Sequence, residues 1–257
     1  MLGISIKKGI GIGDGLQFSS LPENYFRATG QKLLDVSWPW FFDHNPYVVR
    51  DKSIKAEKVI ELWNFSPQQY EWPRPRPPSR PAVYLSNAEI WAEVLKVPCV
   101  LNRPRLYRYE SFPYSKRKNI LFHTSGKSHG ELPQHVVEHV LKKYAGSGCL
   151  YQVGPIDATQ KKLGVTQLQT ESLWDFAELV SSARLFIGID SGPSWVANCY
   201  PDVVVKKIRV KPNPPRLFKD WTPLEIRNVH SHWDDRCHQV FNLSEDDIGF
   251  TYSYTRL

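Results

Sequence analysis

Two short glycine-containing turns carry the side chains that could do chemistry. Near the N-terminus, the run Gly9-Ile-Gly-Ile-Gly-Asp-Gly15 places the carboxylate of Asp14 among small residues, which let a ligand approach the backbone closely. A carboxylate held there could act as a general base and take a proton from an attacking hydroxyl group. It could equally cap the helix that follows, a role that aspartate favours. On the local sequence both interpretations stay open, and under the first one Gly13 would line the ligand site.

The second turn, Asp190-Ser-Gly-Pro-Ser194, lies between two apolar segments. If a helix begins there, its unpaired backbone amides would suit a diphosphate group. The alternative is an ordinary strand-to-helix turn that Ser or Asp caps. The candidate binding residues of this turn are Asp190, Ser191, Gly192, Pro193 and Ser194.

Neither turn matches a standard nucleotide-binding fingerprint. The dinucleotide motif G-x-G-x-x-G would need a glycine at Asp14 or at Leu16, depending on the glycine from which it is counted. Gly126-Lys-Ser128 imitates the end of a P-loop, but the residue five positions before Gly126 is Leu121 instead of glycine. The sequence therefore argues against a dehydrogenase and against a P-loop kinase.

Alternating apolar strands and amphipathic helices must position these turns. Strands are expected at 2–6, 33–36, 119–123, 149–153, 185–189 and 203–210, and helices at 16–25, 132–141 and 173–183. This alternation predicts an α/β protein with parallel sheets, in which ligands bind beyond the carboxyl ends of the strands. Two candidate segments, 124–128 and 190–194, follow strands there, which adds Thr124, Ser125 and Gly126 to the candidates. We place the domain boundary in the charged run near 115–118, giving domains 1–115 and 116–257.

The first half also carries arginines interleaved with aromatic residues. Arg74 and Arg76 stand in a proline-rich stretch that must be extended, and Arg103 and Arg105 follow near Tyr107. Such side chains suit a phosphodiester backbone or exposed bases. The alternative is a solvated, extended loop without a ligand.

Composition limits the classes of partner. The chain has 257 residues and a formal net charge of +7, which favours anionic partners without identifying one. No segment is long and apolar enough to span a membrane, and no signal peptide is visible, so we expect a cytoplasmic protein. His135 and His139 lack the glutamate spacing of an H-E-x-x-H motif, and we expect no metal site and no cofactor.

Several motifs in order resemble those of glycosyltransferase family nine, the heptosyltransferases. The resemblance is carried by Gly11-Ile-Gly-Asp-Gly-Leu16, Leu150-Tyr-Gln-Val-Gly154, the segment 173–185 and Leu185-Phe-Ile-Gly-Ile-Asp-Ser-Gly-Pro-Ser194. It is dense from about residue 119 to residue 200, and is otherwise confined to residues 2–25.

This resemblance implies a GT-B architecture, with two Rossmann-like domains facing across a cleft and the donor nucleotide mainly on the C-terminal one. It implies metal-independent, inverting transfer of a sugar from a nucleotide diphosphate to a hydroxyl group. By the same resemblance, Asp14 is the catalytic base, Lys127 contacts the donor phosphate, and Gln152 lies in the donor site together with residues 190–194. Lysine and backbone amides can stabilise a leaving diphosphate without a divalent metal.

The sequence departs from the family where histidine commonly follows the Asp-Ser-Gly motif, because this chain has Trp195. Residues 26–115 show no clear match, which leaves the acceptor open. The expected acceptor is anionic, either a lipopolysaccharide-type glycan or a hydroxymethylated pyrimidine in phage-type DNA. With the glycan, the protein would contact a membrane surface peripherally. With the DNA, it would act in the cytoplasm of a host cell. The competing hypothesis is a non-catalytic protein that binds nucleic acid or a nucleotide sugar.

Overall fold

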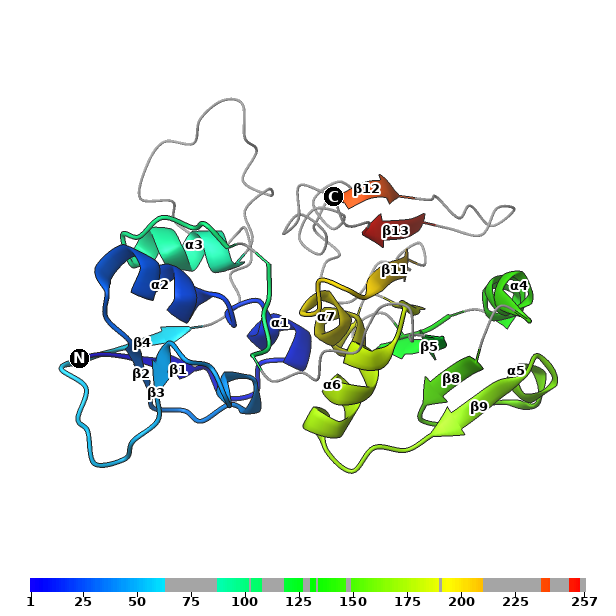
Figure 1. The fold of residues 1–257 in the computed structure, drawn as a ribbon, viewed down its shortest axis with the longest axis horizontal. Coiled ribbons are helices and arrows are strands. Elements are labelled where there is room, and N and C mark those ends of the chain that lie inside the picture. Colours follow the sequence, from blue (N-terminus) through cyan, green and yellow to red (C-terminus); the bar gives the residue numbers. More distant parts are fainter. Residues whose placement is uncertain are drawn as a thin grey trace. The chain divides into compact units, whose positions relative to one another are not determined.

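The computed structural model describes residues 1–62, 87–101, 103–107, 118–126, 130–132, 134–146, 149–189, 191–209, 237–240 and 250–254. Those up to Tyr107 form one compact unit, and those from Lys118 onward form a second (Figure 1). The boundary predicted at 115/116 falls in residues outside this description, and it stays a prediction.

The N-terminal unit is built on a four-stranded sheet. Its strands are β1 (Leu2–Ile6), β2 (Leu33–Asp35), β3 (Val48–Val49) and β4 (Lys58–Leu62). They run parallel in the order β3-β2-β1-β4. The carboxyl ends of β1 and β2 therefore lie next to each other, and this edge carries the glycine turn of Asp14.

Short helices follow the strands of this unit: α1 (Ile12–Leu16), α2 (Leu21–Thr29), the 3-10 turn η1 (Trp40–Phe42) and α3 (Asn87–Val94). The helix predicted at 16–25 was placed wrongly, because one helix ends at Leu16 and the next begins at Leu21. Pro22 explains the new start, since proline fits the first turn of a helix and not its interior. Helix α2 packs against β2 and α3 (Figure 1).

The second unit contains a seven-stranded sheet. Five strands are parallel: β5 (Asn119–His123), β8 (Cys149–Val153), β9 (Val165–Leu168), β10 (Leu185–Ile189) and β11 (Val204–Arg209). The antiparallel strands β13 (Phe250–Tyr254) and β12 (Cys237–Val240) extend it beside β11. The full order is β12-β13-β11-β10-β5-β8-β9. A small hairpin, β6 (Ser125–Gly126) with β7 (Gly130–Glu131), follows β5.

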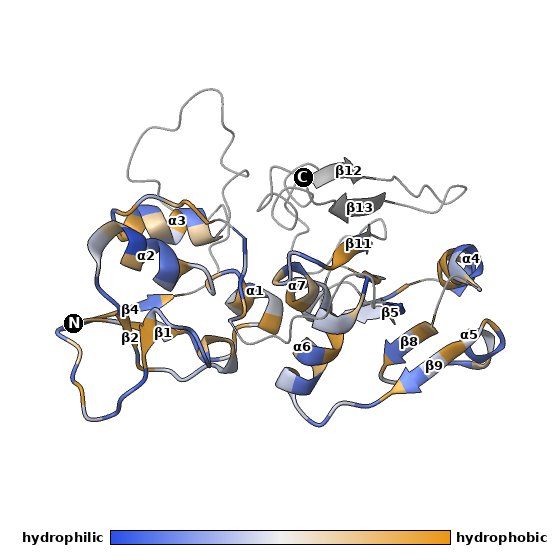
Figure 2. Cartoon of the chain, viewed as in Figure 1, coloured by the Kyte–Doolittle hydropathy of each residue, from blue (hydrophilic) through white to orange (hydrophobic). Residues whose placement is uncertain are grey.

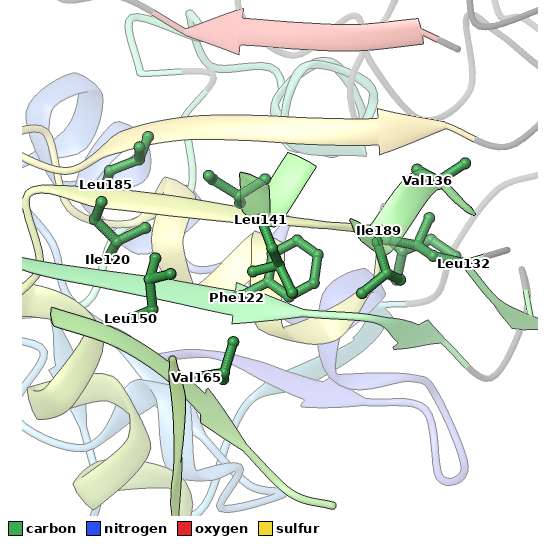
Figure 3. Packing of buried hydrophobic residues seen from close by; sticks show 11 residues of the cluster. Ile120, Phe122, Leu132, Val136, Leu141, Leu150, Val165, Leu185 and Ile189 are labelled. Carbon is green, nitrogen blue, oxygen red and sulfur yellow. The ribbon is translucent and has the colours of Figure 1, made fainter. Parts of the chain in front are cut away.

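Four helices connect these strands: α4 (Gln134–Tyr144), α5 (Ala158–Lys162), α6 (Leu173–Ser182) and α7 (Gly192–Asn198). Buried side chains from one face of the sheet, among them Ile120, Leu150 and Ile187, pack with Val136 and Leu141 of α4 (Figure 3). The alternate residues of the same strands are buried too, as at Leu121 and Phe186. Both faces of the sheet are therefore covered, which explains why its strands read as continuous apolar runs.

The hydropathy of the residues reflects the difference between buried strands and the helices that cover them. In Figure 2, β1 and β2 are largely hydrophobic, whereas α2 and α4 carry both hydrophobic and hydrophilic residues, as helices on the surface of a sheet do. Among the described residues, no helix is both long and apolar enough to cross a membrane.

Candidate functional site

Asp14 lies in the first turn of α1, directly after the glycine-rich segment that leaves β1. Gly11 is the residue before the helix, and its extended backbone (φ −66°, ψ 155°) sets the direction in which the helix starts. The side chain of Asp14 is half-buried. A Cβ atom added to Gly11 would lie 3.1 Å from the Oδ2 atom of Asp14, so the glycine leaves room for this carboxylate.

Gly15 fixes the back of the same turn. A Cβ atom there would lie 2.8 Å from the Cε1 atom of Phe41, which is buried in η1. The glycine therefore lets α1 pack closely on the aromatic residues after β2. Gly13, the other predicted residue of this turn, is half-buried beside Asp14.

The predicted donor segments meet at one edge of the second sheet. Strand β5 lies between β10 on one side and β8 on the other, and the chain first crosses to β8 and later returns to β10. This reversal makes the carboxyl ends of β5 and β10 the switch point at which open α/β sheets bind ligands. Thr124, Ser125 and Gly126 follow β5 there, and Ser191 follows β10.

His123 and Gly188 bring the two strands close at this point. They are paired in the sheet, and a Cβ atom on Gly188 would lie 2.8 Å from the backbone oxygen of His123. The Nδ1 atom of His123 lies 3.5 Å from the Oγ atom of Ser191. Burial lowers the pKa of His123 to about 4, so its imidazole is neutral at physiological pH. His123 was not among the predicted site residues, although it directly precedes the predicted Thr124.

The turn after β10 is held by its two serines. The hydroxyl of Ser194 accepts a hydrogen bond from the backbone N–H of Ser191 at 3.0 Å and donates one to its carbonyl oxygen at 2.8 Å. Ser194 is fully buried, whereas Ser191, Gly192 and Pro193 are half-buried. In this structure Ser194 shapes the turn, and Ser191 is the hydroxyl nearer the strand edge.

Gln152 lies near the carboxyl end of β8, which pairs with β5, and it is buried. Its side-chain amide donates to the carbonyl oxygen of Pro155 at 2.6 Å, and its oxygen accepts from the amide of Gln160 at 2.7 Å. The same amide lies 3.5 Å from the hydroxyl of Thr124. These contacts place Gln152 beside the predicted donor segment and fix its orientation from within the protein.

The predicted basic residues of the first half are only partly described. Arg105 donates to the Oε2 atom of Glu23 at 2.7 Å, and Glu23 also accepts from Tyr107 and Arg27. Burial alone would raise the pKa of Glu23, but the hydrogen bonds from Tyr107, Arg27 and Arg105 outweigh it and lower the pKa.

The residue after Glu23 holds the same stretch of chain. The side chain of Asn24 accepts from the backbone N–H groups of Val100 and Leu101 and donates to the carbonyl oxygen of Leu101. Together with the Glu23 contacts, this ties Val100, Leu101, Arg105 and Tyr107 to α2. Arg105 therefore has a structural partner, and Arg103 is half-buried in the same segment.

Four predicted site residues lie outside the described part of the chain: Asp190, Lys127, Arg74 and Arg76. Trp195, at the position where the family commonly has histidine, is buried in α7 with 4% of its surface exposed. Among the described residues there is no cluster of three or more His, Cys, Asp or Glu side chains that could hold a metal ion.

No protein-family model matches the sequence, and no curated protein matches it in sequence either. Several solved structures do match its fold. The Escherichia coli heptosyltransferase WaaC with ADP-2-deoxy-2-fluoro heptose has a TM-score of 0.56 at 12% identity, over 78% of this chain and 87% of that one. A glycosyl transferase family 9 protein from Veillonella parvula has a TM-score of 0.56 at 14% identity, over 79% of each chain.

A third similar structure is the dodecameric, iron-containing glycosyltransferase TibC from enterotoxigenic E. coli, with a TM-score of 0.59 at 14% identity. The match covers 79% of this chain but only 58% of TibC, which is the longer chain. These likenesses confirm the predicted fold class: this α/β chain has the GT-B fold of the heptosyltransferases.

Proposed function

We propose that this protein is a glycosyltransferase that moves a sugar from a nucleotide-diphosphate donor to a hydroxyl group of an anionic acceptor. The observation that carries the proposal is a combination within the GT-B fold. One unit presents Asp14 on a glycine turn, and the other presents residues 124–126 and 191–193 at the switch point of its sheet. The carboxylate of Asp14 suits activation of the acceptor hydroxyl group, and the strand ends of the other unit suit binding of the donor diphosphate.

The transfer requires one bond to form and one to break. The acceptor oxygen attacks the anomeric carbon of the donor, and the bond from that carbon to the diphosphate oxygen breaks. Asp14 would accept the proton of the attacking hydroxyl group. Lys127 and the backbone amides after β10 would stabilise the diphosphate as its negative charge grows, without a metal ion. A single displacement of this kind inverts the configuration of the sugar.

The neutral His123 fits a donor site of this kind. A protonated imidazole at the switch point would hold the product diphosphate by charge, which would slow its release. The uncharged ring can contact Ser191 and polar atoms of a donor without adding this attraction. Under this proposal the positive charge at the donor comes from Lys127.

The role of Asp14 is tested by the Asp14→Asn and Asp14→Ala variants. Loss of the general base should reduce transfer by about 10²- to 10⁴-fold, while donor affinity stays within about twofold of wild type. Transfer is measured by release of nucleoside diphosphate, and affinity by calorimetry with ADP, UDP and GDP. Normal turnover in Asp14→Ala would exclude the assigned base.

The role of Lys127 is tested by binding. Lys127→Ala should weaken nucleoside-diphosphate binding by about tenfold or more, because it removes a charge-assisted contact with phosphate. Lys118→Ala, an exposed lysine directly before β5 and thus at the amino end of the same strand, is the matched control and should bind normally. Unchanged affinity in Lys127→Ala would remove the residue from the donor site.

A donor-hydrolysis screen separates an enzyme from a binding protein. ADP-, UDP- and GDP-sugars are incubated with the protein, with and without DNA that contains hydroxymethylated pyrimidines. We expect hydrolysis of at least one donor. The absence of hydrolysis and transfer with every donor, together with salt-sensitive DNA binding, would favour the non-catalytic alternative. We also propose that the protein acts in the cytoplasm, where it can contact a membrane surface peripherally. Cell fractionation tests this location.

A further inference from the structure

Trp38 is an exposed aromatic residue at the sheet edge that also carries the turn of Asp14. The residue has 43% of its surface exposed, and it follows β2 at the carboxyl edge of the N-terminal sheet. The hydroxyl of the preceding Ser37 accepts the backbone N–H of Ile6 at 2.8 Å. The turn of Trp38 is thereby attached to the end of β1, from which the chain continues into the Asp14 turn.

The backbone of Trp38 has a conformation that bulky residues avoid. Its φ angle is +57°, in the left-handed region where a large side chain is costly. The buried carboxylate of Asp35 holds this conformation, because its Oδ1 atom accepts the backbone N–H groups of Ser37 at 2.9 Å and Trp38 at 3.0 Å. The fold thus keeps a strained tryptophan on the surface, at the sheet edge that also carries the turn of Asp14.

Two cations lie over the indole ring. The guanidinium carbon of Arg50 is 4.8 Å from the ring centroid, and the ammonium nitrogen of Lys52 is 5.1 Å from it. The guanidinium group of Arg50 has partners within the protein, because it donates hydrogen bonds to Asp35, Asp43 and the carbonyl oxygen of Pro39. Lys52 is exposed, and within the described part of the chain none of the ion pairs includes it. Lys52 is therefore the cation that an incoming anion can reach.

We propose that Trp38 and Lys52 form an acceptor subsite for a sugar that carries a phosphate or carboxylate group. The inference rests on the proposed glycosyltransferase function and names the part of the acceptor that this edge would recognise. The indole offers an apolar surface to the C–H groups of a sugar ring, and Lys52 binds the anionic substituent. The strained backbone aims the indole, and the carboxyl edge of the sheet places the bound sugar near Asp14.

The charge of Lys52 favours an anionic sugar over a nucleobase. The exposed part of the indole can pack against a sugar ring or a planar base, so the ring does not discriminate between the two. The phosphate or carboxylate group of the sugar adds a charged contact with Lys52 that a neutral base lacks. Arg105, which was expected to serve a nucleic-acid backbone, is bonded to Glu23.

The test follows the indole N–H signal of Trp38 by NMR in the full-length protein. The signal is assigned from Trp38→Phe, and the signal of Trp174, in the second unit, serves as an internal control that is assigned from Trp174→Phe. The probes are glucose 6-phosphate, glucose, inorganic phosphate and 5-hydroxymethyl-dCMP. We expect glucose 6-phosphate to shift the Trp38 signal at millimolar concentration, more strongly than glucose or phosphate alone, while the Trp174 signal stays in place.

Two variants separate recognition from folding. Lys52→Gln should weaken glucose 6-phosphate binding by about threefold, the loss expected for one exposed charge pair, and leave glucose binding unchanged. Trp38→Gly should lose the sugar while its thermal midpoint equals or exceeds that of wild type, because glycine adopts the left-handed conformation without a steric cost. A lowered midpoint with sugar binding retained would show that Trp38 only supports the fold, and would overturn the subsite.

The remaining outcomes are also decisive. A Trp38 signal that no sugar shifts overturns the inference, and a stronger response to 5-hydroxymethyl-dCMP than to glucose 6-phosphate replaces the sugar with a base. Donor hydrolysis and ADP binding are measured on the same sample. A protein that hydrolyses a donor without any Trp38 response therefore disproves the subsite alone, and one that binds the sugar without acting on any donor disproves the proposed function.

Discussion

At the scale of single residues, His123 links the candidate donor site to the stability of the second unit. Burial lowers the pKa of this histidine to about 4, whereas an unfolded histidine has a pKa of about 6.5. Between these two values the unfolded chain binds more protons than the folded chain does. Stability must therefore fall as the pH falls from about 6.5 towards 4.

We expect the free energy of unfolding to drop by about 2 kcal/mol between pH 7.5 and pH 5 through His123 alone. Urea titrations at the two pH values measure it. His123→Asn keeps a polar atom near Ser191 and should lose this part of the pH dependence, whereas the exposed His139→Asn should keep it. Glu23 interferes little, because a carboxyl whose pKa is lowered in the folded state loses its contribution mainly as the pH falls below the unfolded value of 4.5. An unchanged pH slope in His123→Asn would contradict the burial effect.

At the scale of elements, the contact of β5 with β10 depends on a glycine. A Cβ atom at Gly188 would lie 2.8 Å from the carbonyl oxygen of His123 and 3.1 Å from its Cβ atom, and neither the backbone nor a Cβ can rotate away. Gly188→Ala should therefore move the strands apart, which destabilises the unit by about 1–3 kcal/mol. Because the carboxyl ends of β5 and β10 form the candidate donor edge, the affinity for ADP should fall as well.

Gly164→Ala, in the same unit, is the matched control for that experiment. Gly164 lies between α5 and β9 with a φ angle of +83° and has nothing within 4 Å of an added Cβ atom, so alanine costs stability through the backbone alone, by about 1–2 kcal/mol. We expect this variant to unfold more easily and to bind ADP normally. Equal loss of ADP affinity in both variants would mean that Gly188 acts on stability only.

The sequence predicts these elements where burial leaves a simple pattern. The runs 120–122 and 185–189 are buried on both faces, so each of their residues is apolar or glycine, and the apolar run predicts a strand. Strand β4 (Lys58–Leu62) mixes charged and apolar residues because it is an edge strand with exposed side chains, and no such pattern marked it.

The same limit applies to the candidate site. The turns of Asp14 and Ser191 could be predicted because glycine and serine clusters are visible in the chain. Trp38 could not, because its role depends on Asp35, Arg50 and Lys52, which only the pairing of β2 with its neighbours brings together.

At the scale of the whole molecule, the two units repeat one plan. The order β3-β2-β1-β4 in the first sheet corresponds to β9-β8-β5-β10 in the second, and all eight strands are parallel to their neighbours within these sets. Each unit has its own buried core, so each can respond to a ligand by itself. The proposed function divides the reaction along this line, with the base and the acceptor subsite on the first unit and the donor edge on the second.

This division predicts how a nucleotide changes unfolding. A ligand that binds only the folded second unit stabilises it by about 2.7 kcal/mol at a concentration one hundred times its Kd, and gives nothing to a unit that it does not contact. In calorimetric scans with ADP we expect the transition of the second unit to move to higher temperature and that of the first unit to stay. Hydrogen exchange assigns the transitions, with the amides of Ile4 and Ile187 as reporters of the two sheets. Equal shifts of both reporters would mean that the units unfold together or that both hold the nucleotide, and the donor could then no longer be assigned to the second unit alone.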